Sequence, residues 1–222
     1  MTRSRRRPYV WVNWLSKLMT GEVRCHWAPW FRTHYMDYTN APSNFQSAVW
    51  ATEHTKLLDE LTNERRAHGE GILKESQSQF RIRRPSGLTI AGKPDLIAID
   101  NEGHATIYDA KTGQPRQSDI IQVMLSMMSL PYGSQLFRDK TLLGCIVYKS
   151  GARSYIPPSA IDNAFQNNVT YFLNALECLN PPTKAPSPIE CGVCDITRED
   201  CSERIESDES NTKEQTEPII PI

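Results

Sequence analysis

The chain has 222 residues, 39% of them hydrophobic, which is enough to bury one core and too few to form two independent domains. It lacks both a run of about 18 apolar residues and a secretory signal, so we expect no membrane-spanning helix and predict a soluble, cytoplasmic protein. The net charge of −1 combines a balance of −4 in residues 202–222 with about +3 in the rest of the chain.

This charge distribution indicates three segments. Residues 1–7 contain the basic cluster RSRRR and are expected to be flexible, either binding an anionic partner or forming a solvated tail. Residues 8–201 are predicted to form a single domain. Residues 202–222 contain too few apolar side chains to fold alone, so we expect an acidic, disordered tail.

Two helices are predicted in the first third of the chain. Residues 12–19, VNWLSKLM, have apolar side chains at helical spacing, and Gly21 is expected to end that helix. Residues 46–66 form the second predicted helix, and its expected apolar side consists of Val49, Trp50, Leu57, Leu58 and Leu61. His54 shares this side, where the simplest interpretation is a core histidine bonded to a neighbour.

Strands are predicted in the middle of the chain, within residues 78–84, 87–92, 95–100 and 105–111, with a turn at NEGH (101–104).

The second half of the chain adds two helices and one strand. Residues 118–130 predict a mostly apolar helix capped by Ser118 or Asp119. Residues 142–150 form a continuous apolar run, which is typical of a strand covered on both faces. Residues 158–179 predict a long amphipathic helix. The order of elements therefore predicts an α/β fold with a mixed central sheet flanked by helices.

Charged residues interrupt the strand pair at 95–111. Side chains two apart share a strand face, so Asp109 and Lys111 point the same way, and the turn places Asp95 opposite Asp109. Two adjacent carboxylates suit Mg²⁺ or Mn²⁺, and a lysine beside them could serve a bound phosphodiester. The alternative is structural, with Asp95 as a turn residue and Asp109 and Lys111 as a surface ion pair.

The motifs GKPD (92–95) and YDAKTG (108–113) resemble motifs II and III of the PD-(D/E)XK nuclease superfamily, especially its RecB-like branch. This resemblance implies a restriction-endonuclease-like fold. It also implies that Asp95, Asp109, Lys111 and Gln122 are catalytic and that His54, Asp95 and Asp109 bind Mg²⁺ or Mn²⁺.

Other positions of the resemblance are less complete. The tyrosine expected four residues after Gln122 is replaced by Ser126. An upstream glutamate often precedes the paired strands in this family, and Glu75 and Glu70 are the two candidates.

Six cysteines in a reducing compartment favour a metal site or buried thiols over disulfides. A C-x2-C-x6-C group near the end of the chain consists of Cys191, Cys194 and Cys201, and Cys25 is the obvious fourth ligand. Four thiolates suit Zn²⁺ or an iron-sulfur cluster, and their spacing does not choose between them. Two further cysteines, expected to be buried, are Cys145 and Cys178.

The arrangement of one early cysteine and a late group of three resembles the iron-sulfur nucleases of the CRISPR-associated RecB-like and AddB types. This resemblance implies a structural [4Fe-4S] cluster joining the two ends of the chain, with Zn²⁺ as the alternative. The x6 spacing, where x5 is commoner, and the HWAPWF sequence after Cys25 depart from the family pattern. We expect Trp27, Trp30, Phe31 and Tyr35 to be core around the cluster rather than base-stacking residues.

The two resemblances together imply a metal-dependent nuclease, with hydrolysis of DNA as the expected reaction. Family members commonly act on single-stranded DNA or free ends, so an exonuclease is expected, acting in DNA repair, recombination or CRISPR adaptation. Protein partners or a homo-oligomer are also expected. Two alternatives stay open: a non-catalytic nucleic-acid-binding module that keeps the fold, and a zinc-stabilised interaction protein.

Overall fold

The computed structural model describes residues 1–42 and 46–206. Most of the predicted acidic tail, from residue 207 onward, lies outside the described residues. Within the described residues, none of the helices combines the length and the apolar character needed to cross a bilayer.

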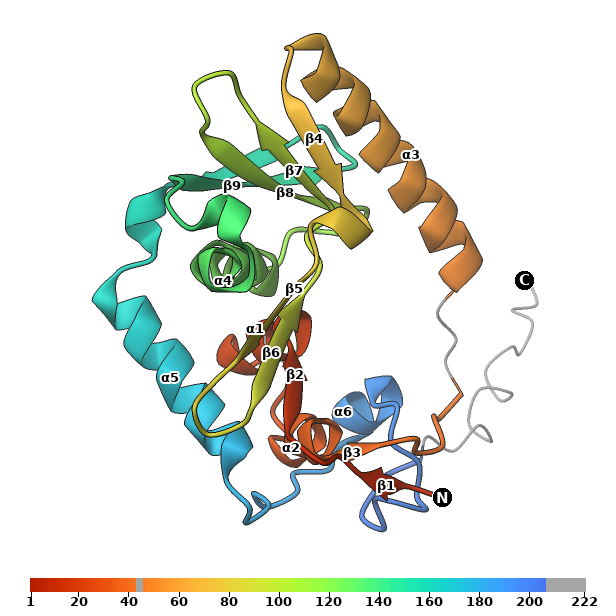
Figure 1. The fold of residues 1–222 in the computed structure, drawn as a ribbon. Coiled ribbons are helices and arrows are strands. Elements are labelled where there is room, and N and C mark those ends of the chain that lie inside the picture. Colours follow the sequence, from red (N-terminus) through yellow and green to blue (C-terminus); the bar gives the residue numbers. More distant parts are fainter. Residues whose placement is uncertain (43–45, 207–222) are drawn as a thin grey trace, which may run out of the picture.

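A five-stranded mixed sheet forms the upper half of the molecule in Figure 1. Its strand order is β10-β9-β8-β7-β4, and only β8 and β9 are parallel. The strands are β4 (Gly71–Lys74), β7 (Leu96–Ile99), β8 (Ala105–Lys111), β9 (Leu142–Tyr148) and β10 (Arg153–Ile156). Two of them, β4 and β10, are strands that the sequence did not predict.

Two helices cover opposite faces of this sheet, α3 (Ser47–Ala67) and α4 (Gln117–Gly133). Strand β9 shows why both faces are apolar: Cys145 and Val147 belong to the core on the α3 side, whereas Ile146 belongs to the core on the α4 side. The predicted burial of both faces of β9 is therefore confirmed.

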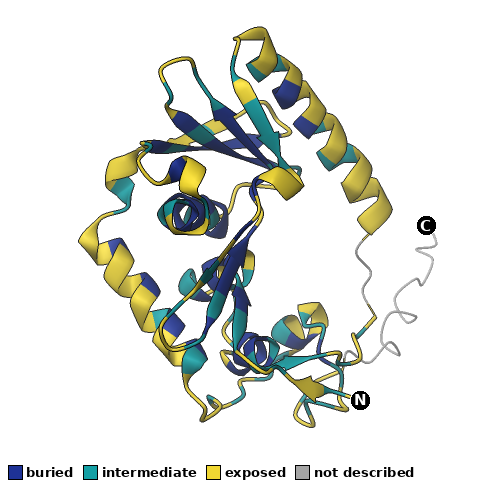
Figure 2. Cartoon of the chain, in the orientation of Figure 1, coloured by how far each residue is buried: buried dark blue, intermediate teal, exposed yellow. Residues whose placement is uncertain are grey.

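The predicted apolar side of α3 is only partly correct. Leu58 and Leu61 are buried against the sheet, but Val49 is 54% exposed and Trp50 is 43% exposed. The first half of the helix extends beyond the edge of the sheet, as the exposed colouring in Figure 2 shows. The sequence periodicity predicted a helix correctly, but it could not show how far the sheet reaches beneath it.

A smaller sheet packs below the first and contains β2 (Tyr9–Trp11), β6 (Thr89–Gly92) and β5 (Phe80–Arg83) in that order. The sequence predicted the last two as strands of one central sheet. They instead leave it and pair with the N-terminal β2, which runs parallel to β6. Gly92 permits this packing because any side chain there would overlap the Phe80 ring.

The remaining helices surround the smaller sheet. They are α1 (Val12–Met19), α2 (Trp27–His34), α5 (Asn163–Glu177) and α6 (Pro188–Val193). Three of the four aromatic residues predicted to be core are buried, namely Trp27, Trp30 and Phe31, and Tyr35 is partly buried. Gly21 follows α1 with a φ of 71°, as its predicted role of ending this helix requires.

Two helix starts differ from the prediction. The N-cap of α4 is Arg116, and Asp119 instead occupies the third helical position, where its carboxylate accepts a hydrogen bond from the Arg116 amide at 3.0 Å. The α5 helix begins at Asn163 because the Asp162 side chain caps it, accepting from the Phe165 amide at 2.7 Å. A short 3₁₀ turn, Pro158–Ala160, precedes it.

The two ends of the described chain lie side by side (Figure 1). Strand β1 (Arg3–Ser4) pairs with β3 (Tyr35–Met36), and Thr2 donates a hydrogen bond to Asp200 at 2.7 Å. The expected flexibility of residues 1–7 and the single-domain layout of residues 8–201 stay predictions.

Candidate active site and four-cysteine region

Two acids and a lysine meet where β7 and β8 lie side by side. The register pairs Leu96 with Tyr108, which places Asp95 opposite Asp109, as the turn predicted. Asp109 is 3% exposed, and Lys111, two residues further on the same strand, projects from the same face. The hairpin alone therefore brings these three charged groups together.

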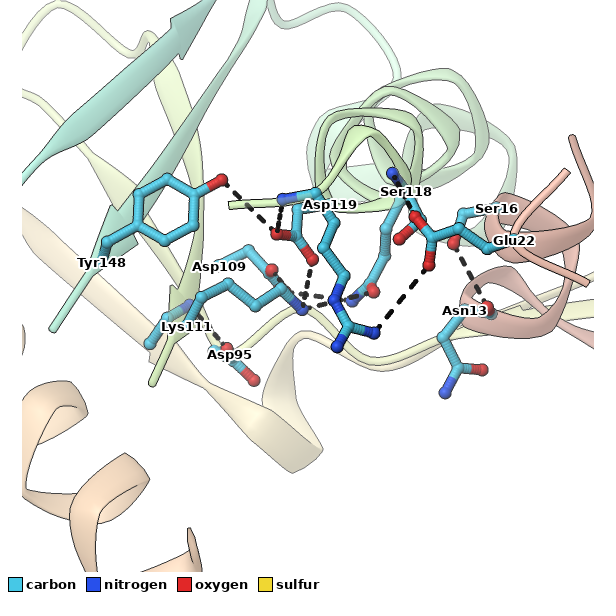
Figure 3. A network of polar contacts seen from close by, with 12 residues as sticks. Asn13, Ser16, Glu22, Asp95, Asp109, Lys111, Ser118, Asp119 and Tyr148 are labelled. Atoms are coloured by element: carbon cyan, nitrogen blue, oxygen red, sulfur yellow. Dashed lines mark hydrogen bonds and ion pairs between the residues drawn. The ribbon is translucent and has the colours of Figure 1, made fainter. Parts of the chain in front are cut away.

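Lys111 and Gln122 each contact one oxygen of the Asp109 carboxylate. Figure 3 shows the Lys111 and Asp109 side chains close together. Lys111 Nζ lies 2.7 Å from Asp109 Oδ2, and Gln122 Nε2 donates to Asp109 Oδ1 at 3.0 Å. The other end of the same amide, Gln122 Oε1, accepts from Lys111 Nζ at 3.4 Å. Gln122 thus comes from α4 to bridge the two charged groups, as the resemblance implied, although it lies 11 residues after Lys111 in the chain.

His54 reaches the site from the opposite face of the sheet. Its Nε2 atom lies 3.2 Å from Asp95 Oδ2, which also accepts a hydrogen bond from the Ala110 amide at 2.8 Å. The Trp50 ring stacks on the imidazole with centroids 4.9 Å apart. His54 is therefore bonded to a neighbour, as its simplest interpretation expected, and that neighbour is a carboxylate of the site.

Burial and charge shift the acid–base properties of these groups. Burial raises the pKa of Asp109 to about 6, against the lowering effect of the Lys111 ammonium. The hydrogen bond to Asp95 raises the pKa of His54. Burial lowers the pKa of Lys111, but the carboxylates of Asp109, Asp119 and Asp95 together outweigh this effect and the net shift is upward. The strongest of these perturbations falls on Asp109, which is the pattern of a functional centre.

The donor set fits a hard divalent cation. Asp109 Oδ2 is buried, and within residues 1–42 and 46–206 its close partner is the Lys111 ammonium, as an ion pair at 2.7 Å without the geometry of a hydrogen bond. Asp95, Asp109 and His54 supply two carboxylates and an imidazole, which are ligands that Mg²⁺ and Mn²⁺ accept. Among the described residues, no group of three or more His, Cys, Asp or Glu side chains is placed to hold a metal ion as it stands.

Two residues that the sequence did not assign to this site also face it. Asp119 Oδ1 lies 3.8 Å from Lys111 Nζ, and Tyr148 donates a hydrogen bond to Asp119 Oδ2 at 3.4 Å. Parallel pairing places Tyr148 directly beside Lys111 on the neighbouring strand. The sequence offered Asp119 only as a candidate helix cap, and it gave no signal for Tyr148 because strand pairing is a tertiary feature.

The two glutamate candidates take different places. The Glu75 amide donates to the Asp95 carbonyl at 3.2 Å, and its backbone has a φ of 42°, a strained value for a residue with a side chain. Glu70 instead pairs with Arg65 at 3.2 Å. Ser126 donates to the Gln122 carbonyl of its own helix at 3.0 Å and contributes no group to the site.

The four cysteines of the predicted cluster line one cavity of about 60 Å³ at the junction of the chain ends, namely Cys25, Cys191, Cys194 and Cys201. Three cationic side chains line the same cavity: Arg32, Lys184 and Arg204. Arg32 donates a hydrogen bond to Cys194 Sγ at 3.8 Å, and the Ile205 amide donates to Cys191 Sγ at 3.4 Å. Donors and positive charges of this kind favour thiolates. At Cys194 and Cys201, however, burial outweighs them, so the net shift of both pKa values is upward.

Other contacts around this cavity join distant parts of the chain. Glu190, on α6, accepts hydrogen bonds from the amides of Arg24 at 2.8 Å and Cys25 at 3.4 Å. Burial raises the pKa of both Cys194 and Cys201. The thiols are therefore recessed, and one carboxylate fixes the loop that carries Cys25.

The two remaining cysteines have different environments. Cys145 is buried in β9, as expected. The prediction that Cys178 is buried is wrong: it is exposed because it follows the last turn of α5, where the chain leaves the helix. Its carbonyl, rather than its thiol, contributes a contact by accepting from Trp30 Nε1 at 2.7 Å.

Comparison with known proteins identifies the class. The sequence model described as "PD-(D/E)XK nuclease superfamily" matches residues 15–196, and the chain belongs to this superfamily. No curated protein matches the chain. A solved structure described as "Crystal structure of SSO0001" is 14% identical and covers 86% of this chain and 85% of its own, with a TM-score of 0.49.

Membership confirms the predicted fold class, since mixed sheets flanked by helices are consistent with the restriction-endonuclease-like fold. It implies nuclease activity on a nucleic acid and the use of Mg²⁺ or Mn²⁺, which this superfamily generally requires.

Proposed function

We propose that this protein is a deoxyribonuclease that uses Mg²⁺ or Mn²⁺ to hydrolyse phosphodiester bonds, acting as an exonuclease on single-stranded DNA or free DNA ends. The observation that carries the proposal is the buried Asp109 carboxylate, which lies opposite Asp95 and is contacted by Lys111 and Gln122. A surface ion pair, the structural alternative, would not bury the carboxylate to 3% exposure.

In this proposal Asp95, Asp109 and His54 hold the divalent cation. When bound, the cation lowers the pKa of a coordinated water and neutralises charge on the phosphate. Glu75 is the better candidate for a further acidic ligand than Glu70, because its backbone contacts Asp95 and its carboxylate pairs only loosely with Lys93, at 3.9 Å. Glu70 is held more closely by Arg65, at 3.2 Å.

Lys111 acts on the phosphate rather than on the cation, and Gln122 positions Lys111 and Asp109. The Lys111 ammonium stabilises the negative charge that develops on the phosphate oxygens as water attacks. Gln122 restrains both the ammonium and the Asp109 carboxylate, so that neither has to reorganise during the reaction. The amide can serve both because it offers a donor and an acceptor.

The four cysteines support the finer proposal of a RecB-like nuclease with a structural [4Fe-4S] cluster. They line one cavity together with three cations and one carboxylate, Glu190, so that positive charge is in excess in the lining and would offset part of the negative charge of a thiolate-ligated cluster. Such a cluster would link the Cys25 loop to α6 and its following segment. Zn²⁺ on the same thiolates is the alternative.

The proposed setting is cytoplasmic DNA repair, recombination or CRISPR adaptation, with protein partners or a homo-oligomer. This part rests on the resemblance of the motifs to the CRISPR-associated and AddB-type nucleases.

The test is a cleavage assay on 5′- and 3′-labelled single-stranded DNA, linear duplex and closed circular DNA, with Mg²⁺ or Mn²⁺. The parent protein is expected to shorten linear strands and to spare closed circles, and the Lys111→Ala variant to lose this activity. The matched control is Lys140→Ala, whose amine donates a hydrogen bond to the Gly103 carbonyl of a distant turn.

Equal cleavage by the parent and the Lys111→Ala variant would contradict the catalytic proposal. A parent that binds DNA without cleaving it would favour the non-catalytic module. Cleavage of closed circles would leave a nuclease but exclude the exonuclease assignment.

A further inference from the structure

The Lys111 ammonium lies between two buried carboxylates, only one of which belongs to the proposed metal-binding pair. Asp109 Oδ2 is 2.7 Å away on one side, and Asp119 Oδ1 is 3.8 Å away on the other (Figure 3). The Asp119 side chain is 11% exposed, so solvent screens this second pair only weakly. A buried acid this close to a catalytic amine requires an explanation.

Contacts to the second Asp119 oxygen fix the orientation of the carboxylate. Asp119 Oδ2 accepts from the Arg116 amide at 3.0 Å and from the Tyr148 hydroxyl at 3.4 Å. Tyr148 is itself 5% exposed and lies beside Lys111 in the register of β8 and β9. One oxygen is thus held by the helix start and the neighbouring strand, which leaves the other directed at the Lys111 amine.

We propose that Asp119, oriented by Tyr148, is a positioning residue that keeps the Lys111 ammonium at the substrate phosphate. This inference rests on the proposed nuclease function. Asp109 carries one negative charge, and both the bound divalent cation and the Lys111 ammonium would depend on it. Because the metal ion and the ammonium are both positive, they repel each other. Asp119 supplies a second charge that belongs to the lysine alone, so the ammonium need not leave when Asp109 binds the cation.

The helix-capping contact of Asp119 can be separated from this electrostatic role. An asparagine at this position keeps an oxygen for the Arg116 amide but removes the charge. A glutamate keeps the charge and is also a favourable residue at the third position of a helix. Tyr148→Phe removes the hydroxyl that orients the carboxylate while preserving the ring packing. Asp139→Asn removes the same charge at an exposed residue near the opposite end of β9 and serves as control.

The experiment measures kcat and KM for Mn²⁺-dependent cleavage of single-stranded DNA. We expect Asp119→Asn to lower kcat by roughly 10- to 100-fold, with KM changed by less than about twofold. Asp119→Glu should recover part of this loss, and Tyr148→Phe should show a smaller decrease than Asp119→Asn. The control variant Asp139→Asn should match the parent.

A second measurement, independent of catalysis, is the affinity for Mn²⁺ without DNA, by titration calorimetry. Asp119→Asn should weaken Mn²⁺ binding by about two- to fivefold. Without the Asp119 charge, Asp109 alone neutralises the Lys111 ammonium and is therefore a weaker ligand for the metal ion. The melting temperature should stay near that of the parent, since the cap oxygen is retained.

The outcomes separate this inference from the proposed function. If the parent cleaves DNA, Lys111→Ala does not, and Asp119→Asn equals the control in both kcat and Mn²⁺ affinity, the inference is wrong and the nuclease proposal stands. If Asp119→Asn lowers the melting temperature together with kcat, and Asp119→Glu restores the melting temperature but not kcat, Asp119 is only a cap residue and the inference is again wrong. A parent without metal-dependent cleavage would overturn both.

Discussion

The two candidate metal sites of this protein differ in how the chain builds them. Asp95 and Asp109 are neighbours across one hairpin, with a register that the strands themselves set. The four cysteines come from opposite ends of the chain and meet only where those ends pack together. A hard-ligand site on rigid strands can be changed without unfolding the protein, whereas the cysteine region closes the chain and should contribute to its stability.

The largest expected effect is on catalysis, at the hairpin. Asp109→Asn should lower DNA cleavage by more than about 100-fold, because even residues that merely contact metal ligands contribute 10- to 100-fold. The thermal unfolding of the metal-free protein should show no loss of stability, since the buried carboxylate is costly to keep charged. Circular dichroism and the cleavage assay on the same preparation check both. An unfolded variant would contradict the claim that the hairpin site can be changed without unfolding the protein.

The next effect is on stability, at the cysteines. Cys191→Ala should lose bound iron and lower the melting temperature by roughly 10 °C, as the loss of several kcal/mol from a 222-residue chain implies. Cys178→Ala is the matched control, because this thiol is exposed and lies outside the cavity. Iron analysis with calorimetry measures both quantities. Unchanged stability together with lost activity would mean that the cysteines serve catalysis directly.

A smaller effect is expected where Glu190 joins α6 to the Cys25 loop. Glu190→Ala removes the acceptor of two amide hydrogen bonds and should cost about 1 to 2 kcal/mol of unfolding free energy. Glu60→Ala, on the exposed side of α3, is the control and should cost less than about 0.5 kcal/mol. Urea titration provides the comparison. Equal costs would show that this contact does not hold the chain ends.

The smallest expected effect is on stability, at Glu64 of α3, and it depends on pH. Hydrogen bonds from Arg153 lower the pKa of Glu64 to about 2, so the folded state favours the ionised carboxylate. The stability gained is present above the ordinary glutamate pKa and is lost as pH falls from about 4.5 toward 2.

The Glu64→Gln variant should therefore melt a few degrees below the parent at pH 7 and equal it near pH 2, with a difference of about 1 kcal/mol or less for this partly exposed pair. Melting curves at several pH values test this. A difference that persists at pH 2 would assign the effect to packing rather than to charge.

The sequence predicted the features that depend on short-range geometry. The strand Ala105–Lys111 and the opposition of Asp95 and Asp109 follow from period-two alternation and one turn, and the structure confirms both. The same local reasoning found the α3 helix but placed Val49 and Trp50 on its buried side, because the extent of the sheet is not a local property.

Features that depend on the packing of distant elements could not be predicted. Asp119 and Tyr148 join the site through the contact of α4 with β9 and the parallel register of β8 and β9. Strands β5 and β6 are not part of the five-stranded sheet, because β6 pairs with β2, which lies far upstream in the chain. The gathering of Cys25 with the late cysteines was predicted because Cys25 is the obvious fourth thiolate, and the resemblance to iron-sulfur nucleases implied it as well.

The most direct test of the account is to locate two different metals in one molecule. Anomalous diffraction from crystals of anaerobically purified protein soaked in Mn²⁺ distinguishes iron from manganese by their absorption edges. The account predicts manganese between the Asp95 and Asp109 carboxylates and iron within the cavity lined by Cys25 and Cys191. Zinc in that cavity would contradict the iron-sulfur proposal, and manganese bound away from both carboxylates would contradict the nuclease centre itself.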